Sequence, residues 1–161
     1  MSLLTAGRPL LDEDYRRLLA FRSELRDFLR WSEQAAQNAD LTPSLHQLLL
    51  VLRGHPVLPG PTIGQAAEEL HIRHHSAVEL AQRAESAGLI CRVRDDADHR
   101  RVHLALTEKG RMQLESLTRE HLPRIQALAQ TLEGVVNPDR RASGHRSRRR
   151  LGGLGEVDEG A

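Results

Sequence analysis

Residues 89–106 carry a β-type pattern in a chain whose other regular patterns are helical, and this pattern constrains the fold most. A strand begins at Leu89-Ile90 and continues to Arg94, and a charged segment follows from Asp95 to His99. Apolar and polar residues then alternate, which is the period of a half-buried strand. The two strands predict a hairpin whose second strand turns one set of residues to the core and the other away from it: Val102, Leu104 and Leu106 against Arg101, His103 and Ala105.

Two long helical patterns lie on either side of the hairpin. The first runs from Asp12 to about Asn38, with apolar residues at helical spacing. The second begins after Thr107, which acts as a cap, and runs to about Leu132. Pro123 lies inside the second pattern and is expected to kink or split that helix.

Shorter helices are predicted between the first long helix and the hairpin. Thr42-Pro43 is a strong helix start, and the helix that follows stops near Gly54. A loop with three prolines comes next. Thr62 and Gln65 then form a capping box for a short helix.

A further helix is predicted at residues 75–87, after a turn at residues 71–74 and before Gly88 as its C-terminal stop. This order of helices and hairpin is that of a winged helix-turn-helix, in which the second helix of the turn enters the major groove of DNA. The predicted fold class is therefore mainly α with a small β-hairpin, a winged helix-turn-helix with long N- and C-terminal helices.

Composition agrees with a helical core and excludes several classes of protein. Aromatic residues make up only 2% and all lie within the first 31 residues, so the remaining core depends on Leu, Ile, Val and Ala. Cys91 is the only cysteine, which excludes an internal disulfide and a cysteine-based zinc cluster. We recognise no signal peptide and no membrane span, and we expect a cytoplasmic chain without cofactor or metal.

The net charge of +1 is unevenly distributed. Residues 137–150 hold six Arg and one Asp, a charge of +5, and residues 151–161 hold three acidic residues, a charge of −3. Residues 1–136 therefore carry a charge of −1, since the three parts must sum to +1. A DNA-binding surface in the body must then be a local patch and not a global field.

The region around the hairpin resembles the MarR family of bacterial regulators. The most specific match is Arg94 to Arg101, which is similar to the family's Asp-x-Arg wing tip, followed by Leu106-Thr107-Glu108-Lys109-Gly110 at the last helix. Weaker matches precede it: Leu41-Thr42-Pro43, Thr62 to Leu70, Arg83 and Gly88-Leu89-Ile90. The resemblance covers roughly residues 12–133.

The resemblance implies a homodimer that binds double-stranded DNA at a pseudo-palindromic operator, usually as a repressor responding to a small-molecule effector. It makes residues 12–38 and 107–133 the dimerisation helices and residues 42–106 the DNA-binding lobe. We expect a flexible arm at residues 1–11. Residues 134–161 are predicted to be a disordered Arg-rich tail, which either attracts phosphate or has no consequence.

Six residues of the predicted recognition helix are candidate DNA contacts: His74, His75, Ser76, Glu79, Gln82 and Arg83. The first turns of such a helix meet base edges, where Ser76 bonds a base or phosphate and Glu79 accepts from cytosine. Arg83 is long enough for phosphate, and a helix N-terminus near the two histidines favours phosphate too. The alternative for His74 and His75 is a metal site, although adjacent helical histidines point in different directions.

Five residues of the wing are the other candidates: Arg92, Arg94, Asp98, Arg100 and Arg101. Arg100, at the tip, is expected to reach a narrow minor groove. A carboxylate at Asp98 suits that position if it orients an arginine, so we predict a bidentate pair with Arg100 or Arg101. Arg92 and Arg94 share one strand face and are expected to touch phosphate. The alternatives are a solvated polar turn at the tip and an exposed strand face at Arg92 and Arg94.

The family's ligand pocket lies between the dimer helices and the DNA-binding lobe, and Trp31, His46 and Arg53 come from helices that border it. They are the candidate pocket residues. The alternative places Trp31 in the dimer core and His46 on the surface. Cys91 is either a redox-sensitive thiol beside Arg92 or an inert strand cysteine.

The sequence distinguishes three function classes. An enzyme is disfavoured because the sequence has no Gly-rich phosphate loop, no HExxH metal motif and no nucleophile elbow. A winged helix that serves only protein–protein interaction needs no arginine-rich wing. A sequence-specific transcriptional regulator explains both the helix order and the charged wing, and it is the function we predict.

Overall fold

The structure is a computed structural model that describes residues 9–56, 58–95, 98 and 100–136. It divides into two compact units. The first, residues 29–123, is called the lobe below. The second joins residues 1–28 to residues 124–161, and its described residues are called the arms.

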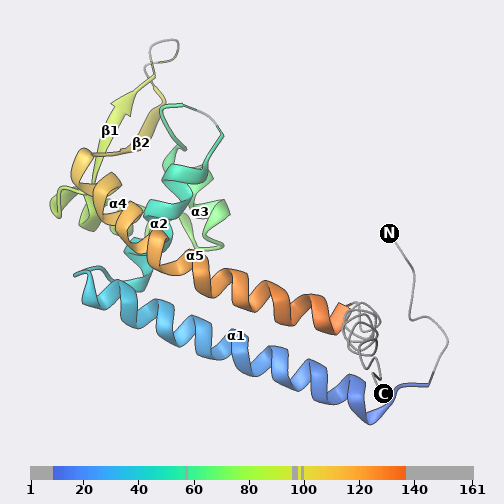
Figure 1. Cartoon of the computed structure of the whole chain (residues 1–161). Helices are drawn as coiled ribbons and strands as arrows, with labels where there is room; N and C mark the ends of the chain where they lie inside the picture. Colours follow the sequence, from blue (N-terminus) through green and yellow to red (C-terminus); the bar gives the residue numbers. More distant parts are fainter. Residues whose placement is uncertain (1–8, 57, 96–97, 99, 137–161) are drawn as a thin grey trace, which may run out of the picture. The chain divides into compact units, whose positions relative to one another are not determined.

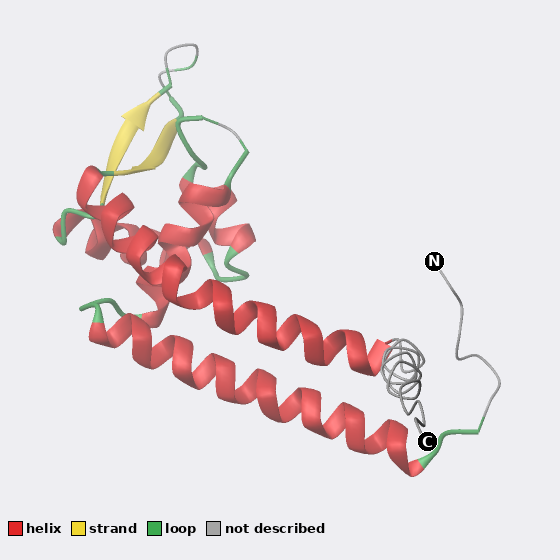
Figure 2. Cartoon of the chain, in the orientation of Figure 1, coloured by secondary structure: helices red, strands yellow, loops and turns green. Residues whose placement is uncertain are grey.

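Helices dominate the described chain, and its one sheet has two antiparallel strands (Figure 1 and Figure 2). The elements are α1 (Asp12–Asn38), α2 (Pro43–Gly54), α3 (Ile63–Glu69), α4 (His74–Ser86), β1 (Ile90–Arg94), β2 (Val102–Leu106) and α5 (Glu108–Val136). This confirms the predicted fold class and element order. None of the described helices is long and apolar enough to cross a membrane.

The lobe has a closed core of leucines and alanines. Leu48 and Leu49 of α2, Leu104 of β2 and Leu117 of α5 are among its fully buried side chains. The buried face of α4 consists of three alanines and Leu80, and α4 packs against α2, α3 and β1. Small side chains allow a helix to approach its neighbours closely, so this core is dense without aromatic rings.

Side-chain caps fix where α2 and α3 begin. The Thr42 hydroxyl accepts the backbone N–H of Leu45 at 3.2 Å. Thr62 and Gln65 form a reciprocal capping box, in which Gln65 Oε1 accepts the Thr62 N–H at 2.9 Å. Both predicted helix starts are confirmed. Each such cap contributes about 1 kcal/mol to stability.

The proline loop that precedes α3 pairs with β2 of the hairpin, like a short third strand. The Leu104 N–H donates to the Pro61 carbonyl at 2.8 Å, and Thr62 forms a β-bridge with His103. The predicted outward position of His103 is therefore wrong, because His103 is buried, at 3% exposure, under this edge. Strand alternation gave the correct face of the sheet, but it could not show that the proline loop covers that face.

Hydrogen bonds from the segment Thr107 to Gly110 join the end of α4 to the start of α5. Thr107 Oγ1 donates to the Gly88 carbonyl at 2.7 Å, and Lys109 Nζ donates to the Ala87 carbonyl at 2.8 Å. Gly110 has no room for a side chain, because a Cβ there would lie 2.1 Å from the Leu89 carbonyl oxygen. The segment thus satisfies carbonyls that a helix end leaves without partners.

Helix α5 continues through Pro123 to Val136, three residues beyond the expected end of the domain. The predicted split is wrong. Proline removes one backbone hydrogen bond, to the carbonyl four residues earlier. Here that residue is Arg119, which is exposed, so water can satisfy its carbonyl. The predicted tail from residue 137 onward lies outside the described residues, as do residues 1–8 of the predicted N-terminal arm.

The arms are built differently from the lobe. A hollow of about 180 Å³ is lined within them by residues of α1 and α5: Glu24, Asp27, Phe28, Arg124, Ala127 and Leu128. Large apolar side chains of the arms are exposed: Leu10, Leu11, Tyr15, Leu18, Leu19, Ile125, Leu132 and Val136. An exposed apolar surface of this kind is typical of a surface that another protein covers.

Candidate nucleic-acid interface

Helix α4 presents its polar side to solvent. The six sequence-predicted contact residues all lie on it, and Ser76 is half-buried while the others are exposed: His74, His75, Glu79, Gln82 and Arg83. The opposite side is fixed in the core by Ala77, Leu80, Ala81 and Ala84. The core therefore holds α4 in place while its outer side remains available to a partner.

The N-terminus of α4 is open to an anion. The helix begins at His74, one residue earlier than predicted, after Arg73 in an extended conformation. Within the described residues, no side chain caps this end. The first N–H groups of a helix without a cap carry partial positive charge and bind phosphate well.

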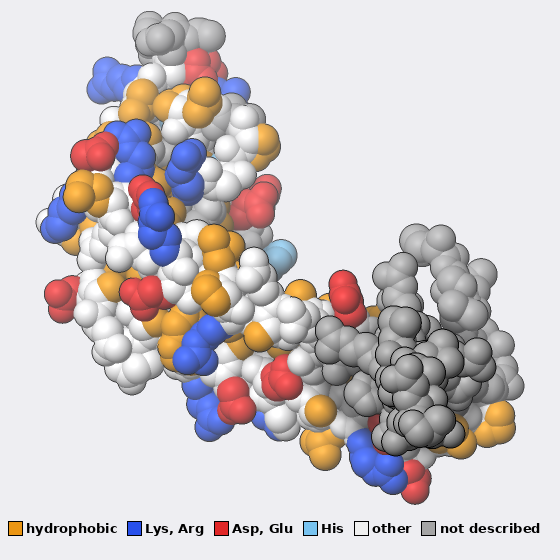
Figure 3. All heavy atoms as spheres, in the orientation of Figure 1, with side chains coloured by type: hydrophobic (Ala, Val, Ile, Leu, Met, Phe, Trp, Pro, Cys, Tyr) orange, Lys and Arg blue, Asp and Glu red, His pale blue; other side chains and the backbone are white. Residues whose placement is uncertain are grey.

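The wing exposes three of its four arginines without an ion pair in the described chain: Arg94, Arg100 and Arg101. Figure 3 shows basic side chains around the hairpin, with acidic ones among them. Residues 96, 97 and 99 of the predicted tip lie outside the described residues.

Asp98 does not form the predicted bidentate pair. Its Oδ1 accepts the backbone N–H of Arg100 at 3.1 Å, and its carbonyl accepts the N–H of Arg101 at 2.8 Å. A short Asp side chain satisfies nearby backbone donors in turns more readily than it reaches a guanidinium. Asp98 therefore shapes the backbone of the tip and leaves the Arg100 side chain exposed.

Arg92 is the exception among the wing arginines. Its Nε donates to Glu85 Oε2 at 3.0 Å, which links β1 to the last turn of α4. Both side chains are partly exposed, so the pair adds little stability by itself. The sequence did not predict this pair, which joins residues of two different elements.

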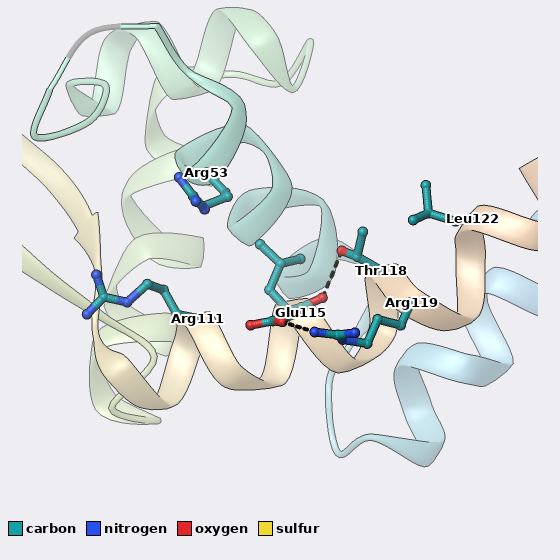
Figure 4. A pocket seen from close by; sticks show the side chains of 7 residues that line it. Arg53, Arg111, Glu115, Thr118, Arg119 and Leu122 are labelled. Carbon is teal, nitrogen blue, oxygen red and sulfur yellow. Dashed lines mark hydrogen bonds and ion pairs between the residues drawn. The ribbon is translucent and has the colours of Figure 1, made fainter.

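The three predicted pocket residues do not converge on one cavity. Trp31 and His46 both approach His121, whose ring centroid lies 4.7 Å from that of Trp31 and 5.0 Å from that of His46. Arg53 instead lines a hollow of about 410 Å³ with side chains of α5 (Figure 4). The alternative that placed His46 on the surface is wrong, since its exposure is 3%.

His121 organises this cluster, and sequence analysis missed it. Its Nδ1 donates to the Leu117 carbonyl at 2.7 Å, and its Nε2 lies 2.8 Å from the Ser32 hydroxyl oxygen. Burial lowers the pKa of His46 below its usual value, and the nearby His121 lowers it further. The sequence signal that could have identified His121 is its position as a polar residue within the apolar stripe of α5.

Cys91 is exposed on β1, and its thiol is free. The alternation of the strand turns it to the face opposite Arg92, so the Arg92 side chain is not directed at the thiol. Metal binding was the alternative for His74 and His75. No group of three His, Cys, Asp or Glu side chains suited to a metal occurs in the described part of the chain.

Comparison with known proteins agrees with this geometry. Residues 39–101 match the model of the MarR family. No match is found among curated proteins.

Solved structures share the fold. The MepR–DNA complex of S. aureus is 24% identical, with a TM-score of 0.61, over 83% of this chain and 96% of that chain. MepR, a transcription regulator of the Staphylococcus aureus multidrug efflux pump MepA, is 23% identical, with a TM-score of 0.62, over 82% and 96%. A MarR family protein from Bacillus stearothermophilus is 22% identical, with a TM-score of 0.61, over 88% and 95%.

Proposed function

We propose, from the match of residues 39–101 to the MarR family model, that the chain is a DNA-binding transcriptional regulator and not an enzyme. The observation that carries the proposal is the exposed polar side of α4, held by its alanine face beside an arginine-bearing wing. One fold neighbour was solved with DNA bound. A regulator of bacterial transcription acts where the DNA is, which places the chain in the cytoplasm.

Helix α4 supplies the base-reading residues. Ser76 and Glu79 lie in its first two turns, which is the part of a recognition helix that meets base edges in the major groove. Glu79 accepts a hydrogen bond from cytosine, and Ser76 bonds a base edge or phosphate. His74, His75, Gln82 and Arg83 flank these two residues and contact the backbone or neighbouring bases.

The wing supplies minor-groove and phosphate contacts. Arg100 enters the narrow, negatively charged minor groove, and the Asp98 turn fixes the backbone from which Arg100 extends. Arg94 and Arg101 contact phosphates. Arg92 contacts phosphate only after it releases Glu85, so it contributes least.

The functional unit we propose is a homodimer on a pseudo-palindromic operator. The exposed apolar residues of the arms, such as Tyr15, Leu18 and Leu19, need a covering surface, and a second copy of the chain provides it. Two lobes related by a two-fold axis then read two half-sites. We also propose that the regulator acts as a repressor.

An effector site at the Trp31–His46–His121 cluster completes the proposal. The cluster combines an aromatic surface with buried polar nitrogens, which is the composition of a small-molecule pocket. His46 also lines an adjacent hollow of about 190 Å³ with Ser32. Arg53 belongs to the separate hollow with Arg111 and Arg119, so it is a second, weaker candidate.

The DNA test uses a duplex that the purified chain selects from a random-sequence library. Arg100→Ala should weaken binding to that duplex about tenfold, because an arginine in the minor groove is lost. The slope of log affinity against log salt should fall in magnitude by about 1 if one phosphate contact is lost as well. The readout is fluorescence anisotropy across a salt series.

The matched control is Arg26→Ala, which removes an exposed arginine of α1 outside the lobe and should leave the affinity unchanged. Failure to select any duplex would reject DNA binding and favour a protein-interaction role for the winged helix. An unchanged affinity of the Arg100 variant would reject the wing contact while leaving the recognition helix in place.

A further inference from the structure

Lys109 is the only lysine in the chain. Every other member of its 23 Lys and Arg residues is an arginine. A guanidinium stays protonated in proteins, so it does not act as a nucleophile, whereas a lysine amine can lose its proton and is a target of acetylation. Lys109 therefore offers the only side-chain amine to which an acyl group can be attached in this protein.

The residues on either side of Lys109 fix the backbone from which its side chain extends. The Thr107 N–H donates to the Leu89 carbonyl at 3.0 Å, and Thr107 Oγ1 donates to the Gly88 carbonyl at 2.7 Å. Gly110 lies so close to Leu89 that a Cβ on it would clash with the Leu89 carbonyl oxygen. The start of α5 is therefore held against the residues that follow α4.

From this position the Lys109 side chain reaches the end of the recognition helix. Its Nζ donates to the carbonyl of Ala87, which is the C-cap residue of α4, at 2.8 Å. The last carbonyls of a helix have no partner within the helix and carry partial negative charge. An ammonium group suits such a carbonyl, because its hydrogen bond is charge-assisted and its charge is opposite to that of the helix end.

The turn that Lys109 holds contains a proposed DNA contact. The Ala87 N–H donates to the Arg83 carbonyl at 3.0 Å, so Ala87 is joined both to Lys109 and to the turn that carries Arg83. The earlier part of α4 is fixed separately, because Ala77, Leu80 and Ala81 are buried in the core. Loss of the Lys109 contact should therefore loosen the last turn of α4 without unfolding the helix.

The Lys109 side chain is also open to reagents in solution. Lys109 is exposed, and no carboxylate of the described chain forms an ion pair with it. Its neighbour Glu108 pairs with Arg111, and Glu85 of α4 pairs with Arg92. Exposed side chains change rotamer within nanoseconds, so a single surface hydrogen bond does not keep the amine from a small acyl donor.

We propose that Lys109 is an acylation site and that its acetylation loosens the last turn of α4, which lowers the affinity of the recognition helix for DNA. Lys109 does not touch DNA in this proposal; it is a positioning residue. The loss of DNA affinity rests on the proposed function, whereas the acetylation and the loosening of the helix end do not.

The co-reactant is an activated acyl compound, either an acyl phosphate or an acyl thioester. The Nζ amine releases a proton to solvent, and its lone pair attacks the carbonyl carbon of the donor. A C–N bond forms, the bond from that carbon to the phosphate oxygen or to sulfur breaks, and phosphate or thiolate leaves. The product is an amide without the positive charge, and it keeps a single N–H. A neutral hydrogen bond is about half as strong as a charged one, so the amide holds the Ala87 carbonyl less firmly.

The first experiment treats the folded, full-length chain at about pH 8 with acetyl phosphate in one arm and with acetyl-coenzyme A in the other. Hydroxylamine then removes labile thioesters from Cys91, whose thiol is exposed. Peptide mass spectrometry should find an acetyl group on Lys109 in at least one arm, and that arm identifies the class of donor. Lys109→Arg should gain no acetyl group at this position. The proposal is overturned if Lys109 stays unmodified in both arms.

The second experiment measures hydrogen exchange in the acetylated chain, in Lys109→Gln and in Lys109→Arg. The glutamine variant carries a neutral amide, like the modified side chain, and the arginine variant keeps the charge. Amides in the last turn of α4 should exchange at least about threefold faster in the acetylated chain and in Lys109→Gln than in the wild type, in line with the loss of one hydrogen bond. Lys109→Arg should exchange at the wild-type rate. Unchanged exchange after acetylation would contradict the proposed loosening.

The third experiment measures affinity for the selected duplex. Acetylation and Lys109→Gln should each weaken binding by about threefold to tenfold. Arg26→Gln removes an equal charge from α1 outside the lobe and should leave the affinity unchanged. Equal losses in the two glutamine variants would mean that net charge, and not the hold on α4, weakens binding, and the positioning role would be rejected. If the wild-type chain selects no duplex, the proposed function fails, and the first two experiments still decide the acetylation and the loosening.

Discussion

Leucines are buried in the core of the lobe but exposed in the arms. In the lobe, a group of leucines forms the core, and Leu49 is completely buried. In the arms, Leu18 and Leu19 of α1 are 50% and 62% exposed. The lobe thus has a filled apolar core within one chain, whereas none of the buried core residues lies in the described part of the arms.

This difference indicates what each part requires in order to be stable. A unit with a filled core depends on how well that core is packed. A pair of helical segments with an open apolar side depends on a second surface, because burial of apolar area is the main driving force available to it. Substitutions at matched leucines can therefore distinguish the two.

The largest effect is expected in the core of the lobe. Leu49→Ala should lower the free energy of unfolding by about 3 kcal/mol, because it removes a fully buried side chain and leaves a cavity. Chemical denaturation at fixed protein concentration measures this. The neighbouring Leu50 is 38% exposed, and Leu50→Ala should cost less than about 1 kcal/mol. Equal losses for the two variants would show that the core is not packed as described.

A substitution in the arms is expected to change the free energy of unfolding less than the core substitution does, and to change self-association more. Leu19→Glu should weaken self-association by at least about tenfold, because a carboxylate would have to be buried against an apolar partner surface. Analytical ultracentrifugation across a dilution series measures the change.

Leu58→Glu is the control for this change, since Leu58 is an exposed apolar residue of the lobe that lies outside both long helices. It should leave self-association intact. If the arms are not the dimer surface, Leu19→Glu will dissociate at the same concentration as the wild type.

The smallest expected effect is a pH dependence of the free energy of unfolding, which originates inside the lobe. Burial and the neighbouring His121 depress the pKa of His46 below its usual value of 6.5. The unfolded chain therefore binds more protons than the folded chain just below that value, so stability rises with pH through this range. His46→Phe should flatten the rise between pH 5 and pH 7, as followed by urea denaturation at each pH. His75→Gln, at an exposed position of α4, should keep the wild-type slope.

Local signals predicted most of this fold. The caps at Thr42 and Thr62, the stop at Gly88 and the alternation of β2 act within a few residues, and each placed its element to within a residue or so. The recognition-helix residues were also found on the correct side of α4, because helical periodicity separates the alanine face from the polar one.

Contacts between distant segments could not be predicted in this way. The burial of His103 depends on a loop more than forty residues earlier in the chain, and the place of His121 depends on Ser32 in the first helix. The bidentate pair predicted for Asp98 failed for a different reason: a residue type does not reveal whether its carboxylate will bind backbone or side chain. The roles of the candidate DNA contacts remain predictions.

The contact between Trp31 and His121 gives the protein an optical property. Trp31 is the only tryptophan in the chain, and its indole lies within the cluster that also holds His46. Indole emission responds to nearby imidazole and to water, and no other indole contributes a background. A change in the packing of this cluster, such as a rotation of the His121 ring, will therefore change the intrinsic fluorescence of the whole molecule, and the unlabelled protein can report on it.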